Sequence, residues 1–363
     1  MSDTEPDGAL AKLNFATFHR DEVRHETYRA GVTAPYYDTY SRTWMVLDPW
    51  QYVELLEAPG LRAVSVSFDG LSKRFDLDLS GLRQIDAHVP LYKEGEEHTQ
   101  ARRRFTERLV ERRAALRAWI ENEVEAFLAP MGRPGEVDVT DDVLRPMIRS
   151  FLSVLTGVDL ENGPPIDLTS LVFDGSVSLK RRLSVFDQLL TLRKYVEGEV
   201  GGSLKSEDID LMVVFTMFGK DPLQYTFGES LKWMLDQHPT MAWRDMTFPD
   251  SPPQTGVPFL ERIATEPVSF RGITIAAGDR IRFFTQGFGY FDELTDIHRY
   301  FGGRAHVCIG RPISVELWRR IVSVLSRFEV VPRIVEYQLD TDNFIFTGPK
   351  RLRLSLSAGD KSQ

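Results

Sequence analysis

The chain has 363 residues, of which 42% are hydrophobic and 27% charged, a globular composition that excludes a disordered or fibrous protein. Its 53 acidic residues outnumber its 44 lysines and arginines, giving a formal charge of −9, which argues against nucleic-acid binding as the main role because that needs a basic footprint. No apolar run is long enough to span a bilayer and no signal segment opens the chain, so we expect a soluble, cytoplasmic protein without membrane contact.

The first quarter of the chain is predicted to mix short helices and strands. Residues 1–12 are polar, and we expect them to be disordered. Residues 42–47 are typical of a strand, and Asp48 is placed to cap a helix that ends before the Pro-Gly pair at 59–60. Residues 61–95 show poor periodicity and several Gly and Asp residues, so a loop with short strands is expected there.

The middle of the chain is predicted to be helical. Apolar periodicity broken by Gly and Pro indicates helical segments at residues 96–127 and 141–155, two further helical stretches between the loop at 163–165 and about residue 200, and a segment at residues 207–237. Asp141 or Asp142 is the expected cap of the second segment, which Gly157 closes. Ser206 is the expected cap of the last and most apolar one.

The last third is predicted to combine short strands with one helix. Residues 249–258 indicate a loop, and residues 268–284 carry strand signals. Residues 285–310 are rich in glycine and aromatics, residues 312–328 predict a helix, and the tail alternates like a strand. The expected fold class is therefore mainly α with small β-sheets (α+β), in a single large domain.

Cys308 is the only cysteine of the chain, so an intramolecular disulfide and a cysteine-based zinc cluster are both excluded. It lies in a glycine-flanked segment directly before a predicted helix. Backbone N–H groups at a helix start stabilise a thiolate, which is the axial ligand that some heme irons take. Gly310 lets the backbone pass close to a flat macrocycle, and His306 is near enough to bond a propionate. An inert, buried cysteine is the alternative interpretation.

This segment resembles the heme-binding loop of the cytochrome P450 family, whose pattern is Phe-Gly-x-Gly-x-His/Arg-x-Cys-x-Gly. The matching positions are Phe301, Gly302, His306, Cys308 and Gly310. Arg304 stands where the second glycine is expected, so it either reshapes the loop or adds a cation near the propionates. Further segments match the family in the same order, over roughly residues 35–358.

The resemblance implies a cytochrome P450-like heme domain over residues 1–363, heme b (iron protoporphyrin IX) as the cofactor, and Cys308 as the ligand of its iron. His98 and Arg102 match the family's His-x-x-x-Arg helix. Because they are four residues apart they share a helix face, which suits a propionate carboxylate. Arg271 is a weaker candidate for a further propionate contact.

The helix that carries Arg102 has a locally basic face. Its arginines are Arg102, Arg103, Arg104, Arg108, Arg112, Arg113 and Arg117, against Glu107 and Glu111. The simplest interpretation is a solvated helix face. The resemblance offers a second one, the docking of an acidic ferredoxin on the Arg102–Arg117 helix, because electrons enter the family's enzymes on this side.

The long apolar helix departs from the family's oxygen-activating pattern, Ala/Gly-Gly-x-Asp/Glu-Thr-Thr. Here Gly219 and Asp221 match, but Pro222 replaces the first threonine. Proline removes a backbone N–H and cannot donate a proton as a hydroxyl does. Thr226 shares the face of Pro222 one turn later, and Asp221 is the remaining candidate acid. These four residues are the predicted catalytic set.

A second departure concerns the family's Glu-x-x-Arg pair. In the aligned segment Arg262 matches, but Phe259 replaces the glutamate. The stretch between Gly278 and Phe301, which this pair pins in the family, is also short. The missing glutamate and the short stretch are consistent with each other, because a shortened stretch no longer needs the Glu–Arg pair that holds it in place.

The resemblance implies a heme-thiolate oxidoreductase acting on a small organic substrate, in specialised metabolism. Pro222 favours atypical oxygen activation, peroxide use or chemistry other than hydroxylation. The alternative is a heme-free P450-like auxiliary protein that activates a partner such as a glycosyltransferase, which the missing glutamate favours and the retained Cys308, His306, His98 and Arg102 oppose. A heme sensor or carrier is a third possibility.

Overall fold

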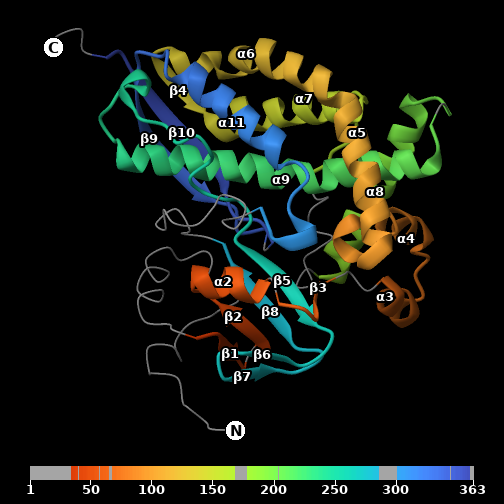
Figure 1. The fold of residues 1–363 in the computed structure, drawn as a ribbon. Helices are drawn as coiled ribbons and strands as arrows, with labels where there is room; N and C mark the ends of the chain where they lie inside the picture. The colour runs from red at the N-terminus through yellow and green to blue at the C-terminus, as the bar shows by residue number, and fades with distance from the viewer. Residues whose placement is uncertain are drawn as a thin grey trace. The chain divides into compact units, whose positions relative to one another are not determined.

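The computed structural model describes residues 34–39, 41–56, 58–64, 68–167, 178–202, 204–285, 301–343 and 345–359 (Figure 1). The chain divides into two compact units, residues 1–64 with 258–305 and residues 65–257 with 306–363. Each unit has a hydrophobic core of its own. The disorder predicted for residues 1–12 lies outside the described part of the chain.

The smaller unit is built on a β-sheet. Its elements are β1 (Tyr36–Asp38), β2 (Thr43–Val46), α2 (Pro49–Leu56), β3 (Leu61–Ala63), β5 (Phe259–Ala264), β6 (Val268–Phe270), β7 (Ile273–Ile275) and β8 (Arg280–Phe284). Five strands form one sheet in the order β1-β2-β8-β5-β3, in which only β2 and β8 pair in parallel. The strands β6 and β7 make a separate hairpin. Apolar residues of α2 pack on β2, β5 and β8 in the core.

A helix cap and a tight turn shape the smaller unit. Asp48 Oδ1 accepts the backbone N–H of Gln51 at 2.8 Å, which confirms Asp48 as the cap of α2. The β6–β7 turn holds Arg271 and Gly272 at φ values of +44° and +86°. Glycine adopts this left-handed backbone region without strain, whereas an arginine in it is uncommon.

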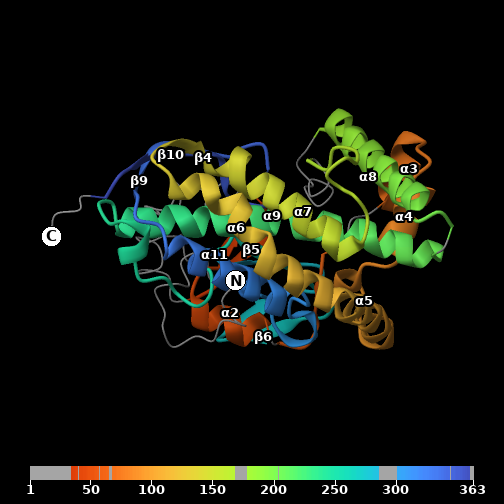
Figure 2. The same cartoon turned by 90° about the horizontal axis from the view of Figure 1, so that it is seen from above.

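The larger unit is mainly helical. Its helices are α3 (Phe68–Phe75), α4 (Ser80–Asp86), α5 (Gly95–Asn122), α6 (Val124–Leu128), α7 (Arg145–Thr156), α8 (Leu179–Glu199), α9 (Ser206–Gln237) and α11 (Arg311–Leu325). Shorter helical turns lie at η3 (Pro90–Tyr92), η4 (Ala129–Gly132), η5 (Val139–Leu144) and η7 (Trp243–Asp245), while the residues of η9 (Arg304–His306) are divided between the two units. Helix α9 is 32 residues long, and α7 and α8 both pack against it (Figure 2).

A three-stranded antiparallel sheet completes the larger unit. It consists of β4 (Gly135–Asp138), β10 (Pro349–Ser357) and β9 (Val331–Leu339), with β10 in the centre. Leu352, Leu354 and Leu356 alternate along β10 and are buried with the helical core. This period of two is the alternation that predicted strands in the tail. The predicted fold class, mainly helical with small sheets, is confirmed.

The prediction for residues 61–95 is wrong in most of its length. Only β3 is a strand there, and the segment holds the helices α3 and α4. These helices have 8 and 7 residues, which is too short for a helical period to stand out. Leu82 and Ile85 of α4 are buried in the core, so packing stabilises α4 where its own sequence does not.

Two predicted helix caps are also wrong. Asp138 accepts the backbone N–H groups of Thr140 and Asp141 at 3.1 and 3.2 Å, so it caps the π-helical turn η5 ahead of α7, and neither Asp141 nor Asp142 has that role. The predicted end of α7 is confirmed, because Gly157 has φ +77° in the left-handed region.

Ser206 is the first residue of α9, and the N-cap position belongs to Lys205, whose side chain makes no capping bond. The hydroxyl of Ser206 instead accepts from Gln84 Nε2 at 2.6 Å and Arg193 Nη2 at 2.7 Å. It therefore ties the start of α9 to α4 and α8. A tertiary role of this kind leaves no local signal in the sequence.

The alignment of Phe259 and Arg262 with a Glu-x-x-Arg pair is wrong as well. Both residues lie in the strand β5. Side chains three residues apart share a face on a helix, but they point to opposite faces of a strand. Arg262 Nη1 donates to the backbone carbonyl of Glu261 at 2.8 Å.

Candidate functional site

Cys308 lies between η9 and α11, in the larger unit. The residue has exposed surface, yet the protein atoms packed around the sulfur desolvate it, and this raises the pKa of the thiol. Hydrogen bonds from the backbone N–H groups of Gly310 and Arg311 lower that pKa, as do the charges of Arg102 and Arg311. Such donors and cations are what stabilises an anionic sulfur.

His98, in the first turns of α5, lies beside His306 at the end of η9. His98 is 5% exposed, and its Nε2 has no hydrogen-bond partner among the described residues. Its ring lies against that of His306, with centroids 4.4 Å apart. Glu94 Oε1 is 3.6 Å from His306 Nε2. Burial, and after it the charge of Arg102, lowers the pKa of His98.

Arg102 links the histidine pair to the cysteine. It follows His98 by one turn of α5. Burial lowers its pKa, while its interaction with Cys308 acts in the opposite direction. The structure thus brings together four residues that the sequence places in two distant segments: His98, Arg102, His306 and Cys308.

This set of residues fits a thiolate-ligated heme. A polar atom that is buried without a partner calls for one from a bound group, and His98 Nε2 is such an atom. Arg102 and the two imidazoles suit the carboxylates of heme propionates, and a thiolate suits the iron. Among the described residues, no group of three or more His, Cys, Asp or Glu side chains could hold a metal ion.

The rest of the cysteine motif has the backbone features that its glycines predict. Gly302 has φ +78°, in the left-handed region. Gly310 precedes α11, and its carbonyl accepts from both the N–H and the hydroxyl of Ser314 at 2.9 Å. Phe301 is partly buried, and Arg304 is the first residue of the 3-10 turn η9.

Arg271, the weaker propionate candidate, lies at the β6–β7 turn of the smaller unit. Its Nη2 and Nε atoms both donate to Glu54 Oε2, at 2.6 and 3.1 Å. Both side chains are about half exposed. The guanidinium is thus held by a carboxylate of its own unit.

The predicted catalytic residues of α9 have different surroundings. Pro222 lies inside the helix, where its missing N–H interrupts the hydrogen-bond ladder. A Cβ at Gly219 would lie 2.9 Å from Leu152 Cδ2, so a glycine there lets α9 approach α7 closely. Thr226 Oγ1 accepts the backbone N–H of Gly256 at 2.9 Å. Its hydroxyl therefore already anchors the loop that follows α9.

Asp221 is one of three buried acids of this helix, with Asp210 and Glu229, and has 2% of its surface exposed. Lys220 Nζ is 2.8 Å from Asp221 Oδ1 and 3.5 Å from Oδ1 of the exposed Asp167. Asn343 Nδ2 donates to the other oxygen, Asp221 Oδ2, at 3.2 Å. Asp221 thus has a cation beside it, Lys220, and a second contact, Asn343, that the sequence did not reveal. Nothing in the local pattern could have revealed it, because the turn between β9 and β10 supplies it.

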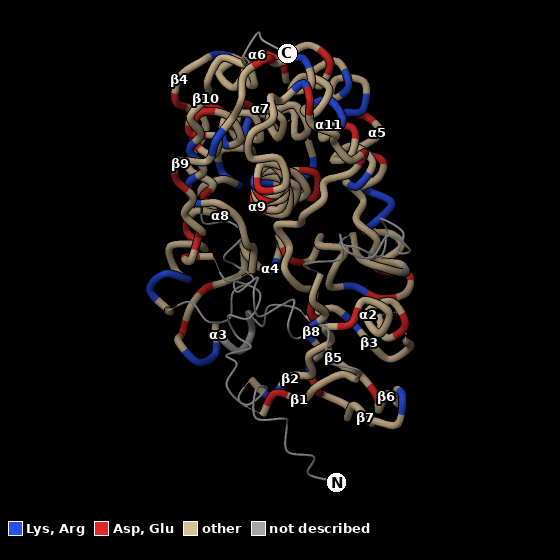
Figure 3. The backbone as a smooth tube through the Cα atoms, turned by 90° about the vertical axis from the view of Figure 1, so that its left-hand side faces the viewer, with Lys and Arg blue, Asp and Glu red and all other residues tan. Residues whose placement is uncertain are grey.

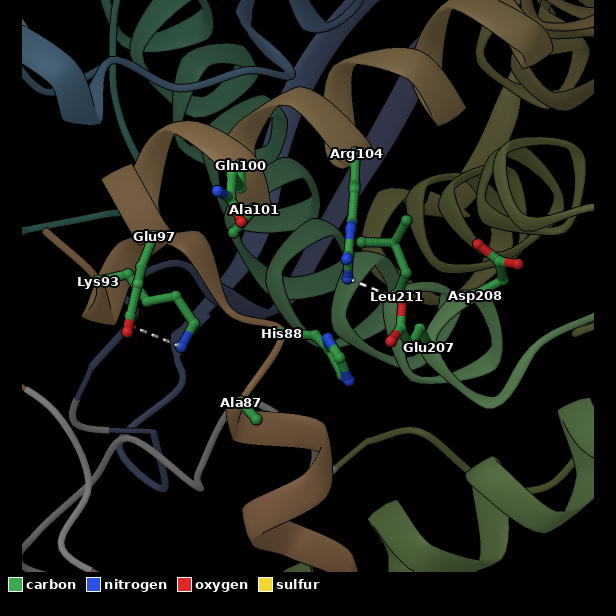
Figure 4. A pocket seen from close by; sticks show the side chains of 10 residues that line it. All are labelled: Ala87, His88, Lys93, Glu97, Gln100, Ala101, Arg104, Glu207, Asp208 and Leu211. Carbon is green, nitrogen blue, oxygen red and sulfur yellow. Dashed lines mark ion pairs between the residues drawn. The ribbon is translucent and has the colours of Figure 1, made fainter. Parts of the chain in front are cut away.

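A separate polar cavity of about 180 Å³ opens between α4, α5 and the start of α9, and is lined by none of the residues predicted for heme binding or catalysis (Figure 4). Ion pairs flank it: Lys93 with Glu97 at 3.6 Å, and Arg104 with Glu207 at 2.9 Å. His88 lies between these pairs in Figure 4. Its Nε2 is 3.7 Å from the buried Asp210. Charges of both signs cancel here, so the cavity favours no single class of ligand.

The arginines of α5 form a less uniform basic face than the sequence suggests. Arg108 and Arg112 donate to backbone carbonyls at the end of α7, at 3.0 and 2.8 Å. Arg104 and Arg117 pair with Glu207 of α9 and Glu316 of α11. Both basic and acidic residues lie along α5 (Figure 3). Four of the seven arginines of α5 therefore make contacts to neighbouring helices.

Comparisons with known proteins identify the fold. No family model and no curated protein matches the chain. Solved structures do match: CalO2 at 16% identity, with 95% of this chain and 98% of that chain covered and a TM-score of 0.71. P450 RauA, complexed with a biosynthetic intermediate of aurachin RE, matches at 15% identity, with 96% and 99% covered and a TM-score of 0.71. The cytochrome P450 enzyme CYP109B1 from Bacillus subtilis matches at 17% identity, with 92% and 98% covered and a TM-score of 0.62.

These matches run over nearly the whole chain and include both compact units, so the chain has the cytochrome P450 fold. Within the described residues, none of the helices combines the length and the apolar character that a membrane crossing requires.

Proposed function

We propose that this chain, which has the cytochrome P450 fold, is a heme-thiolate oxidoreductase built as one heme domain over residues 1–363. The observation that carries the proposal is the meeting of Cys308 and Arg102 with the buried, unpartnered Nε2 of His98. When bound, heme b would supply the redox chemistry with which dioxygen or peroxide oxidises an organic substrate. The protein would bind the heme, pair with its propionates and exclude water from it.

On the thiolate side, four residues would do this work. Cys308 would be the iron ligand, and the N–H groups of Gly310 and Arg311 favour the anionic form of its sulfur against the effect of burial. His98, Arg102 and His306 would donate hydrogen bonds to the propionates. A propionate next to His98 would also satisfy the nitrogen that has no partner among the described residues.

On the opposite side, proton handling would fall to Asp221. Pro222 has no hydroxyl, and the Thr226 hydroxyl is bonded to the Gly256 N–H. Asp221 is the acid directly before Pro222 in the interrupted turn of α9. This arrangement favours peroxide use or a reaction other than ordinary hydroxylation.

The substrate we propose is a small organic molecule of specialised metabolism. Support comes from P450 RauA, of similar fold, which is complexed with a biosynthetic intermediate. If electrons are needed, an acidic ferredoxin docking on the exposed arginines of α5 would supply them. A soluble, cytoplasmic protein is consistent with such a donor.

The test is the reduced carbon-monoxide difference spectrum of the purified chain, beside Cys308→Ser. We expect the native chain to be pigmented with the red-shifted Soret band of thiolate ligation, and the variant to lose that band. A colourless chain that does not take up added hemin would contradict the proposal and favour the heme-free auxiliary protein. An unchanged Soret band in Cys308→Ser would exclude Cys308 as the ligand.

A further inference from the structure

The turn between β9 and β10, residues 340–348, reaches the acid of α9 through one buried amide. Asn343 is 4% exposed. Its Oδ1 accepts the backbone N–H groups of Ile345 and Phe346 at 3.1 and 3.0 Å, which fixes the orientation of the amide. Its Nδ2 then has to point at Asp221 Oδ2, 3.2 Å away. The backbone of the turn therefore sets the direction in which Asn343 Nδ2 donates.

The turn itself is held firmly on α9. The Tyr225 hydroxyl donates to Asp340 Oδ2. Gly348 packs so closely on Tyr225 that a Cβ at that glycine would lie 2.3 Å from the Tyr225 Cβ. The N–H of Thr347 donates to the Gly256 carbonyl at 2.9 Å. The amide of Asn343 is thus carried by a rigid support at both ends of the turn.

The Asn343–Asp221 hydrogen bond is surrounded by a protonated phenol and a lysine. Burial, and after it the charges of Asp221 and Asp340, raises the pKa of Tyr225 far above its ordinary value, so the phenol keeps its proton. Lys220 is the cation that faces Asp221, and it also reaches the exposed Asp167. Lysine is a flexible point charge. The amide of Asn343, which also bonds the Tyr225 hydroxyl, is a donor to Asp221 whose direction the turn sets.

We propose that Asn343 is the positioning residue of Asp221: it holds the carboxylate in the one orientation in which that group exchanges protons with the reacting molecule. The proposal rests on the proposed heme-thiolate function. It adds a residue on the β9–β10 turn to a reaction otherwise assigned to α9 and the cysteine segment. It also explains why a turn so far along the chain is docked tightly on the interrupted part of α9.

The test separates the orientation of Asp221 from the integrity of the turn. Asn343→Asp keeps an oxygen for the N–H groups of Ile345 and Phe346 but removes the donor to Asp221. Asp342→Asn is the matched control, because it changes a charge in the same turn at an exposed pair with Lys350, whose Nζ is 3.0 Å away. Asp221→Asn and the double variant Asp221→Asn/Asn343→Asp complete the cycle.

Each heme-loaded variant is mixed with hydrogen peroxide, and the rate of the Soret change is followed, beside the carbon-monoxide spectrum and the thermal unfolding midpoint. We expect Asn343→Asp and Asp221→Asn each to slow the reaction by about tenfold or more. The double variant should be no slower than Asp221→Asn alone, because both changes act through one carboxylate. Asp342→Asn should react as the native chain does.

Three outcomes count against the proposal. Native rates in Asn343→Asp, or single effects that multiply in the double variant, overturn the positioning role and leave the heme-thiolate function standing. Slow reaction in Asp342→Asn shows that any disturbance of the turn suffices, and it overturns the specific role of the amide. A native chain without the thiolate spectrum overturns both the function and the role that depends on it.

Discussion

Asp86, at the end of α4, is a single residue whose ionisation opposes the fold. Burial raises its pKa from 3.8 to about 6, and the charge of Lys93 offsets this only in part. Between these two values the folded chain binds more protons than the unfolded chain. Stability is therefore expected to fall as the pH rises from about 4 to about 6, and the full cost remains at neutral pH.

Asp86→Asn removes this cost. We expect the free energy of unfolding at pH 7 to increase by about 1–2 kcal/mol, a figure reduced for the solvent that still reaches the carboxyl. Urea unfolding at pH 4, 5, 6 and 7 measures it, and the gain should vanish at pH 4. The control is Asp78→Asn, because hydrogen bonds from Ser80 lower the pKa of Asp78 and its charge is favourable. An Asp86→Asn variant no more stable than the native chain at pH 7 would refute this account.

At the scale of the element, α9 is defined by the proline in its middle. Threonine at position 222 would restore a backbone N–H and add a hydroxyl beside Asp221. We expect Pro222→Thr to change the ratio of product formed to electrons or peroxide consumed, by about threefold or more, because a second proton donor enters the site. Pro222→Ala restores the N–H alone and serves as the control. Equal ratios in all three proteins would remove Pro222 from the mechanism.

The elements also show what the sequence can and cannot predict. Asp48, the helix α7 with its closing Gly157, and the alternating leucines of β10 were predictable because their signals are local. The helix α4 was not, because its stability comes from packing against distant residues. The same division holds in the site. The cysteine motif and the spacing of His98 and Arg102 are local patterns, whereas Asn343 reaches Asp221 only through the folded chain.

At the scale of the whole molecule, an acidic protein that receives electrons from an acidic partner needs a local basic surface. Arg113, exposed on α5, is free of the contacts to α7 that Arg108 and Arg112 make. We expect Arg113→Glu to slow reduction by an acidic ferredoxin by about threefold to tenfold at low salt, with a smaller effect at high salt.

Stopped-flow reduction at increasing salt measures this effect. Arg333→Glu, which makes the same charge change on the exposed edge of β9, is the control for net charge. If both variants slow reduction equally, the effect comes from overall charge, and docking on α5 is contradicted.

The unsatisfied imidazole nitrogen of His98 has a consequence for how the protein matures. A buried nitrogen that has no partner among the described residues costs about 1–3 kcal/mol, and under the proposed function a heme propionate beside it would remove that cost. Heme binding would then stabilise the folded chain. In a cell starved of iron, the newly made chain would be the form that proteases remove first.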